Sequence, residues 1–119
     1  VIYKWFYNSY PEFRVKSKSK KVKQPRCLLV HNFLNPRSVQ EGAKLAGCGL
    51  TKGVPDLTLL LPRGGYGALF IELKIDDEKP KDYQIEVMDF LESVGYKVTW
   101  TNNEEEAKKI ILDYLGLKS

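Results

Sequence analysis

The sequence GVPDLTLLLPRGGYGALFIELK occupies residues 53–74. It holds two largely apolar runs of strand length, residues 53–61 and 68–74, with the glycine-rich segment PRGGYG between them. Glycine and proline mark turns, so this pattern predicts a β-hairpin with a longer loop and two buried strands. We expect the rest of the fold to be built around this hairpin.

Three ionisable residues interrupt the apolar stretch. Asp56 stands at the start of the first strand, and Glu72 and Lys74 stand at the end of the second. Side chains alternate between the two faces of a strand, so Glu72 and Lys74 share one face while Leu73 points to the other. Pairing the two strands would bring Asp56 close to both.

These three residues together form a candidate functional site. Buried charges are costly unless they are paired or bind a cation. Two carboxylates supply the hard oxygen ligands that Mg²⁺ prefers, and the backbone carbonyl of Leu73 could add another. Lys74 would then be placed to orient or deprotonate a water molecule and to neutralise charge on a phosphate. A partly exposed salt bridge at a strand end remains the alternative, since so short a pattern also arises by chance.

With Gln84 and the segment GYKV at residues 95–98, this pattern resembles the virus-type replication-repair nuclease (VRR-NUC) family of the PD-(D/E)xK nuclease superfamily, in its stand-alone viral or phage form. The resemblance extends from about Val1 to Leu115. It implies a restriction-endonuclease-like core and a Mg²⁺- or Mn²⁺-dependent endonuclease that hydrolyses DNA phosphodiester bonds. It also implies a homodimer that acts on branched DNA in the manner of a Holliday-junction resolvase.

The resemblance assigns roles to individual residues. Asp56, Glu72, Lys74 and Gln84 would be catalytic, with the metal held by Asp56, Glu72 and the Leu73 carbonyl. The amide of Gln84 would hold a phosphate or a water molecule without competing for the metal. The family usually carries a further Glu on its first helix, but residues 1–11 contain no acid. We expect that Glu to lie upstream of Val1 in a longer first helix, or to be missing from this member.

Length and composition favour a single soluble globular domain spanning residues 1–119. Two cysteines without a Cys-x-x-Cys pair, and one histidine, His31, exclude a disulfide framework and a zinc or histidine-based metal site. No run is long and apolar enough to span a membrane, and no signal peptide opens the chain. We therefore expect no membrane partner and a location in the cytoplasm, that of the host cell if the protein is viral.

The charge is unevenly distributed. Residues 1–53 carry a net charge of +9 and residues 54–119 a net charge of −5. Seven basic residues and no acid occur in residues 14–26, the basic arm, which is either a solvated loop or a phosphate-binding segment. Asn32 matches an Asn of the family. The residues predicted to bind nucleic acid are Lys16, Lys18, Lys20, Lys21, Lys23, Arg26, Asn32, Arg63, Lys79 and Lys81.

The remaining patterns predict helices and strands on either side of the hairpin. Apolar residues at helical or alternating spacing predict helices over residues 1–10, 38–46, 81–94 and 104–115, and strands over 27–31 and 96–101. In the helix over 81–94 we expect Ile85, Met88, Leu91 and Val94 to face the core. This order indicates an α/β fold with a mixed central sheet flanked by helices.

Two other functions fit the same residues. The first is a catalytically silent nucleic-acid-binding module, in which Asp56, Glu72 and Lys74 form a structural ion-pair network. The second is a hydrolase of RNA or of a sugar phosphate, since nothing in the sequence identifies a reader of the 2′-hydroxyl group. For the dimer, we expect the aromatic residues of the first helix to supply part of the interface.

Overall fold

The computed structural model describes residues 2–16, 26–32 and 52–117. Within these ranges four strands form one sheet in the order β1-β2-β3-β4. They are β1 (Leu29–His31), β2 (Leu57–Leu59), β3 (Leu69–Leu73) and β4 (Lys97–Thr101). The strands β1, β2 and β3 pair antiparallel, and β4 pairs parallel to β3. The predicted mixed sheet and its central hairpin are therefore confirmed, while the helix predicted over residues 38–46 lies outside the described residues.

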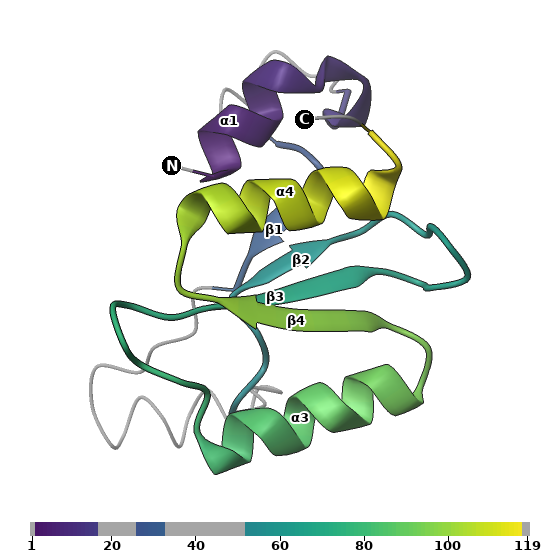
Figure 1. The fold of residues 1–119 in the computed structure, drawn as a ribbon. Helices are drawn as coiled ribbons and strands as arrows, with labels where there is room; N and C mark the ends of the chain where they lie inside the picture. Colours follow the sequence, from purple (N-terminus) through teal and green to yellow (C-terminus); the bar gives the residue numbers. More distant parts are fainter. Residues whose placement is uncertain (1, 17–25, 33–51, 118–119) are drawn as a thin grey trace, which may run out of the picture.

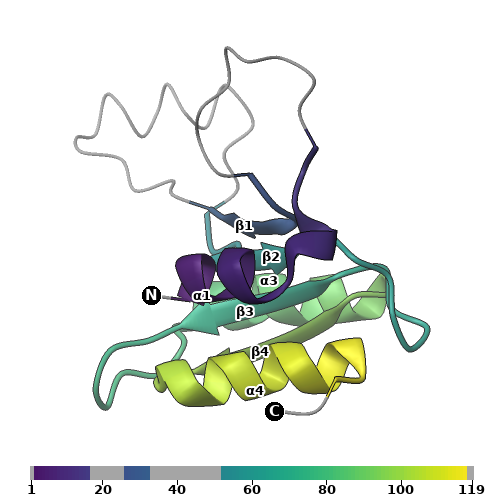
Figure 2. The ribbon, with the colours of Figure 1, turned by 90° about the horizontal axis from the view of Figure 1, so that it is seen from above.

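Helices cover both faces of the sheet. The helices α1 (Ile2–Ser9) and α4 (Glu104–Leu115) lie on one face, and α3 (Asp82–Ser93) lies on the other (Figure 1). Figure 2 shows the same layers from above, with α3 behind the sheet. A short 3-10 helix, η1 (Pro11–Phe13), follows α1. In these ranges no helix has the length and apolar character needed to cross a membrane.

The hydrophobic core lies between the sheet and the pair α1 and α4. Alternation along the strands sends one set of side chains to this layer and the opposite set toward α3. Seven large core side chains are almost fully buried: Phe6, Leu29, Leu57, Leu59, Leu69, Ile71 and Ile111. The α3 side of the sheet instead carries Thr58, Glu72 and Val98, so its buried layer is partly polar.

The helix ends follow the residues that the sequence places there. Pro11 follows the end of α1. The Asn103 side chain accepts a hydrogen bond from the Glu106 N–H at 3.1 Å and caps α4. Gly116 ends α4 with a φ of 72°, a left-handed conformation that glycine adopts without steric cost.

The expected core face of α3 is wrong in part. None of its residues is buried, and Ile85 and Val94 are 42% and 54% exposed. The reason is the partly polar surface that α3 covers, which provides no continuous apolar layer for a full helix face. The side of α3 that faces the sheet contributes instead to a polar cluster.

The aromatic residues of the first helix also differ from expectation. Phe6 is fully buried, and Tyr3, Trp5, Tyr7 and Tyr10 pack against the core of their own chain. Their rings contact one another, as in the edge-to-face pair of Trp5 and Tyr10 at 5.8 Å. The apolar surface that we expected to remain for a subunit interface is therefore used within the chain.

Candidate active site

Asp56 and Glu72 meet at one end of the sheet. The strand β2 pairs with β3 so that Leu57 lies opposite Ile71, and continuing this register by one residue sets Asp56 opposite Glu72. Directly opposite residues have Cβ atoms about 5 Å apart. The ladder is prolonged by a side chain, because Asp56 Oδ2 accepts the Leu73 N–H at 2.9 Å. The two carboxylates are thus held together by the hairpin itself.

Gln84 joins the residues that follow β3 to the start of α3. Its Oε1 accepts hydrogen bonds from Lys74 Nζ at 2.7 Å and from the Lys81 N–H at 2.8 Å. Its Nε2 donates to Glu72 Oε1 at 3.2 Å. Lys74 Nζ lies 3.7 Å from that same carboxylate oxygen, and its side chain is only 9% exposed. One amide therefore positions both Lys74 and Glu72 and also satisfies a backbone donor at the N-terminus of α3.

Glu72 is left with an unused acceptor. It is 3% exposed, and its Oε2 is buried without a hydrogen-bond partner in the described part of the chain. Burial raises the pKa of Glu72 from its usual 4.5 to about 7, the negative charge of Asp56 acts in the same direction, and Lys74 opposes both. A buried carboxylate without a full set of hydrogen bonds, beside a second carboxylate, is typical of a site that binds a cation.

Asn32 fixes the segment that leads into Asp56. Its Nδ2 donates to the Pro55 carbonyl at 2.8 Å and to Thr58 Oγ1 at 3.1 Å. Its backbone N–H donates to the Asp56 carbonyl at 2.6 Å. Asn32 therefore orients the site through the backbone of Pro55 and Asp56 and the side chain of Thr58.

Known proteins resemble the chain both in sequence and in fold. The VRR-NUC domain matches residues 3–104, which is most of the chain. The chain belongs to the VRR-NUC family. It is also similar to a solved structure described as a VRR_NUC domain protein, with 29% sequence identity and a TM-score of 0.67. That similarity covers 87% of this chain and 81% of the other. No curated protein matches the chain.

The VRR-NUC domain is a nuclease-type domain, and its family generally uses divalent metals. The residues present fit such an ion, because Asp56 and Glu72 supply hard oxygen ligands and Glu72 Oε2 lacks a partner. The N–H of Leu73 donates to the Asp56 carboxylate. Because the N–H and C=O of one strand residue point toward the same neighbouring strand, the Leu73 carbonyl also points to the side of Asp56. No cluster of three or more His, Cys, Asp or Glu side chains suited to a metal occurs among the described residues.

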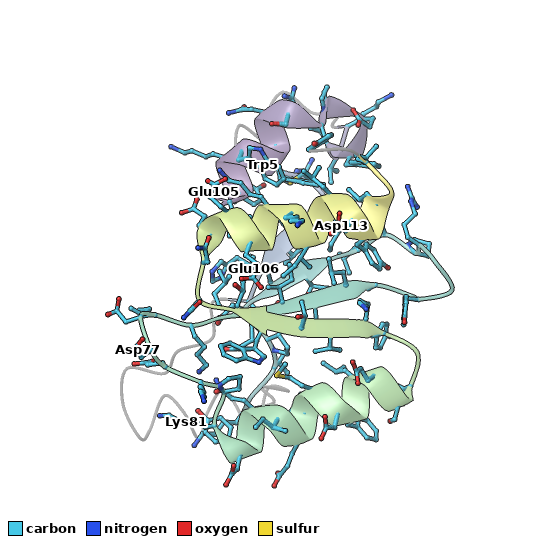
Figure 3. The ribbon with its side chains drawn as sticks, viewed as in Figure 1. Trp5, Asp77, Lys81, Glu105, Glu106 and Asp113 are labelled. Atoms are coloured by element: carbon cyan, nitrogen blue, oxygen red, sulfur yellow. The ribbon has the colours of Figure 1, made fainter. Side chains whose placement is uncertain are left out.

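Only part of the predicted nucleic-acid-binding set of this VRR-NUC domain lies near the carboxylates. Lys81 and the loop that contains Lys79 stand at the N-terminal end of α3, at the same end of the molecule as the carboxyl end of β3 (Figure 3). Arg63 lies in the hairpin turn at the opposite end of the sheet. Lys16 and Arg26 are exposed. Lys18, Lys20, Lys21 and Lys23 lie outside the described residues.

Three residues near the site of this VRR-NUC domain were not anticipated from the sequence. Thr58 is buried and receives the Asn32 amide, which an alternating strand pattern could have indicated. Trp100 lies opposite Glu72 in the parallel pairing of β3 and β4, and no sequence pattern specified that register. Lys52 Nζ lies 4.6 Å from the centre of the Tyr83 ring, next to the site.

Proposed function

We propose that this VRR-NUC domain is a divalent-metal-dependent endonuclease that hydrolyses phosphodiester bonds in branched DNA. A nuclease-type domain implies DNA as the substrate, and the metal and the DNA structure are our additions. The observation that supports the metal is the buried Glu72 oxygen without a hydrogen-bond partner in the described chain, beside Asp56 and Lys74. The branched substrate rests on the resemblance described in the sequence analysis.

The residues of the site have distinct roles in this reaction. Asp56, Glu72 and the Leu73 carbonyl would hold Mg²⁺ or Mn²⁺. The bound ion would lower the pKa of a water molecule and neutralise charge that develops on the phosphate. Lys74, whose ammonium donates to Gln84 Oε1 at 2.7 Å, would orient the attacking water and neutralise negative charge on the phosphate.

The sequence suggested that Gln84 holds a phosphate or a water molecule. Its amide is instead bonded to Lys74, Glu72 and Lys81. We therefore assign Gln84 a positioning role, in which it keeps the Lys74 ammonium and the Glu72 carboxylate in fixed orientations before substrate arrives.

A metal titration tests this proposal against a silent DNA-binding module. Thermal unfolding is followed with increasing Mn²⁺ for the wild type, Asp56→Asn and Glu72→Gln, because an ion that binds only the folded state raises its melting temperature. We expect stabilisation of the wild type, and little or none in either variant. Asp113→Asn, a change to an exposed acid on α4, serves as the control and should respond like the wild type. Equal stabilisation of all four proteins would contradict the assigned metal site.

We also propose that the active unit is a homodimer, because two sites related by a two-fold axis present equivalent chemistry to two equivalent strands of a branched DNA. Light scattering combined with a cleavage assay on a four-way junction tests this. A monomer that still makes paired, symmetric cuts would contradict it.

A further inference from the structure

Trp100 lies immediately beside the carboxylate site. In the parallel pairing of β3 and β4 its register partner is Glu72. Neighbouring strands lie about 4.8 Å apart, and register partners project to the same face of a sheet. The indole therefore stands on the α3 side of the sheet, where Glu72 and Lys74 meet Gln84.

The indole of Trp100 has no aromatic, cationic or hydrogen-bonding partner in the described part of the chain, and the residue is 36% exposed. The other tryptophan is engaged differently, since Trp5 packs edge-to-face on Tyr10 and has Lys108 Nζ 5.5 Å from its ring. Tyr83, the other exposed aromatic beside the site, carries Lys52 over its ring. Trp100 thus offers a partly exposed aromatic ring next to the catalytic residues, without an aromatic, cationic or hydrogen-bonding partner among the described residues.

We propose that Trp100 is a stacking surface for an unpaired nucleobase next to the scissile phosphate. This inference rests on the nuclease function proposed above and adds a determinant of its substrate preference. A base inside a continuous duplex is already stacked on both faces, whereas an unpaired base at a flap or branch point offers a free face to an aromatic ring. The site would therefore favour DNA in which the cut phosphate adjoins an unpaired nucleotide.

A cleavage experiment compares two substrates of the same sequence, a flap and a fully paired duplex. Losing one base–aromatic stack lowers binding by about 10- to 100-fold, so Trp100→Ala should lose about that factor in kcat/KM on the flap and little on the duplex. Trp100→Phe keeps an aromatic face and should retain most of the preference. Phe90→Ala is the matched control, because Phe90 is 67% exposed on the last turn of α3, away from Gln84. It should leave both rates unchanged.

A purely structural role for Trp100 gives a different result. Trp100→Ala would then lower the melting temperature and reduce the flap and duplex cleavage rates by the same factor. The ratio of the flap rate to the duplex rate would stay at its wild-type value in both Trp100→Ala and Trp100→Phe. Such a pattern would overturn the proposal.

A binding experiment separates failure of this inference from failure of the nuclease function. The chain has two tryptophans, so Trp5→Phe leaves Trp100 as the single fluorescent reporter. In the absence of divalent metal, oligothymidylate should quench its emission as a base stacks on the indole. Binding seen by fluorescence anisotropy without a change in Trp100 emission would contradict stacking. If the wild type cuts no DNA with any metal, the nuclease proposal fails while this measurement still decides whether Trp100 stacks.

Discussion

The Glu72 carboxylate is buried beside Asp56, and this arrangement opposes folding whenever both groups are ionised. Lys74 and Gln84 each contact one of its oxygens, while the other has no hydrogen-bond partner in the described chain. In a metal enzyme such a cost is expected, since the ion later supplies the missing interaction. The ionised form of Glu72 that would bind the metal therefore lowers the stability of the folded chain.

This effect predicts a pH dependence. Glu72 has a pKa of about 7 in the folded chain, raised from 4.5, so the unfolded chain loses the proton first as the pH rises. Its contribution to stability is complete below pH 4.5 and is lost as the pH rises to about 7. Glu72→Gln carries no such proton. Without metal, the free energy of unfolding of Glu72→Gln minus that of the wild type should therefore increase by about 1 to 3 kcal/mol as the pH rises from 4.5 to 8.

Urea unfolding of both proteins in EDTA, repeated with excess Mn²⁺, checks this. The metal should restore the wild type above pH 7 and leave Glu72→Gln unchanged. A stability difference that does not vary with pH would show that Glu72 ionises normally in the folded chain.

At the scale of elements, the N-terminus of α3 and the site share one side chain. Gln84 accepts the Lys81 N–H, one of the donors that a helix start leaves unpaired, and the same oxygen accepts Lys74. The position of α3 on the sheet and the orientation of Lys74 are therefore linked.

Replacing Gln84 should affect both properties. Gln84→Ala should cost about 1 kcal/mol in stability, the usual effect of losing a helix cap, and should also reduce cleavage because Lys74 loses its acceptor. Asn103→Ala removes the cap of α4 and should cost a similar amount of stability with normal cleavage. Urea unfolding and single-turnover cleavage of both variants test this. Equal activity in the two variants would mean that Gln84 acts only as a cap.

Gly53 is where the segment before Asp56 approaches α3. Its φ is 98°, and an added Cβ would lie 2.9 Å from the Tyr83 carbonyl oxygen. Gly116 also has a positive φ, but among the described residues nothing beyond its own helix and chain neighbours lies within 4 Å of its added Cβ. Both Ala substitutions incur the left-handed backbone cost of about 1 to 2 kcal/mol, and Gly53→Ala should lose about 1 kcal/mol more through the clash. Equal losses in urea unfolding would show that α3 moves away without cost.

The sequence was most informative about single elements. Two apolar runs around a glycine-rich turn identified the hairpin, and alternation set Glu72 and Lys74 on one face near Asp56. The observed helix ends fall at residue types that commonly end or cap helices, namely Pro11, Asn103 and Gly116. Contacts between elements were less accessible. The parallel pairing of β4 with β3, which sets Trp100 beside Glu72, depends on tertiary packing that has no local pattern. The exposed face of α3 was missed because apolar periodicity indicates a helix face but not the polarity of the surface beneath it.

At the scale of the whole molecule, positive charge is concentrated in the first half of the sequence, which contains the basic arm, and negative charge in the second half, which contains Asp56 and Glu72. The two ends of the basic arm are joined, since Arg14 pairs with Cys27 and the Val15 N–H donates to the Arg26 carbonyl at 2.9 Å. Arg14 itself donates from Nε to the Tyr7 carbonyl and covers the Tyr7 ring, so it anchors the arm to α1. Because both ends are joined, the ten residues between them form a loop that can extend at most about 17 Å from this base.

The arm should therefore contribute to DNA affinity through phosphate contacts. Changing Lys16, Lys18, Lys20 and Lys21 to Gln should weaken binding and reduce the slope of log K against log salt by up to about 4. The control variant changes four lysines outside the arm to Gln, so that its net charge falls by the same amount: Lys4, Lys97, Lys108 and Lys109. It should leave the slope of log K against log salt nearly unchanged. Binding is measured by anisotropy across a salt series. Equal slopes in the two quadruple variants would favour a solvated loop.

The central claim is that Asp56, Glu72 and Lys74 form one hydrolytic site, and Lys74→Ala tests it most directly. With Mn²⁺ and a branched DNA, we expect the single-turnover cleavage rate to fall by about 100- to 10,000-fold, the usual contribution of a positioned acid–base group. Stabilisation by Mn²⁺ and DNA affinity should stay close to wild type, and Lys109→Ala, a change on exposed α4 surface, should cut normally. Cleavage by Lys74→Ala at a rate near that of the wild type would contradict the account.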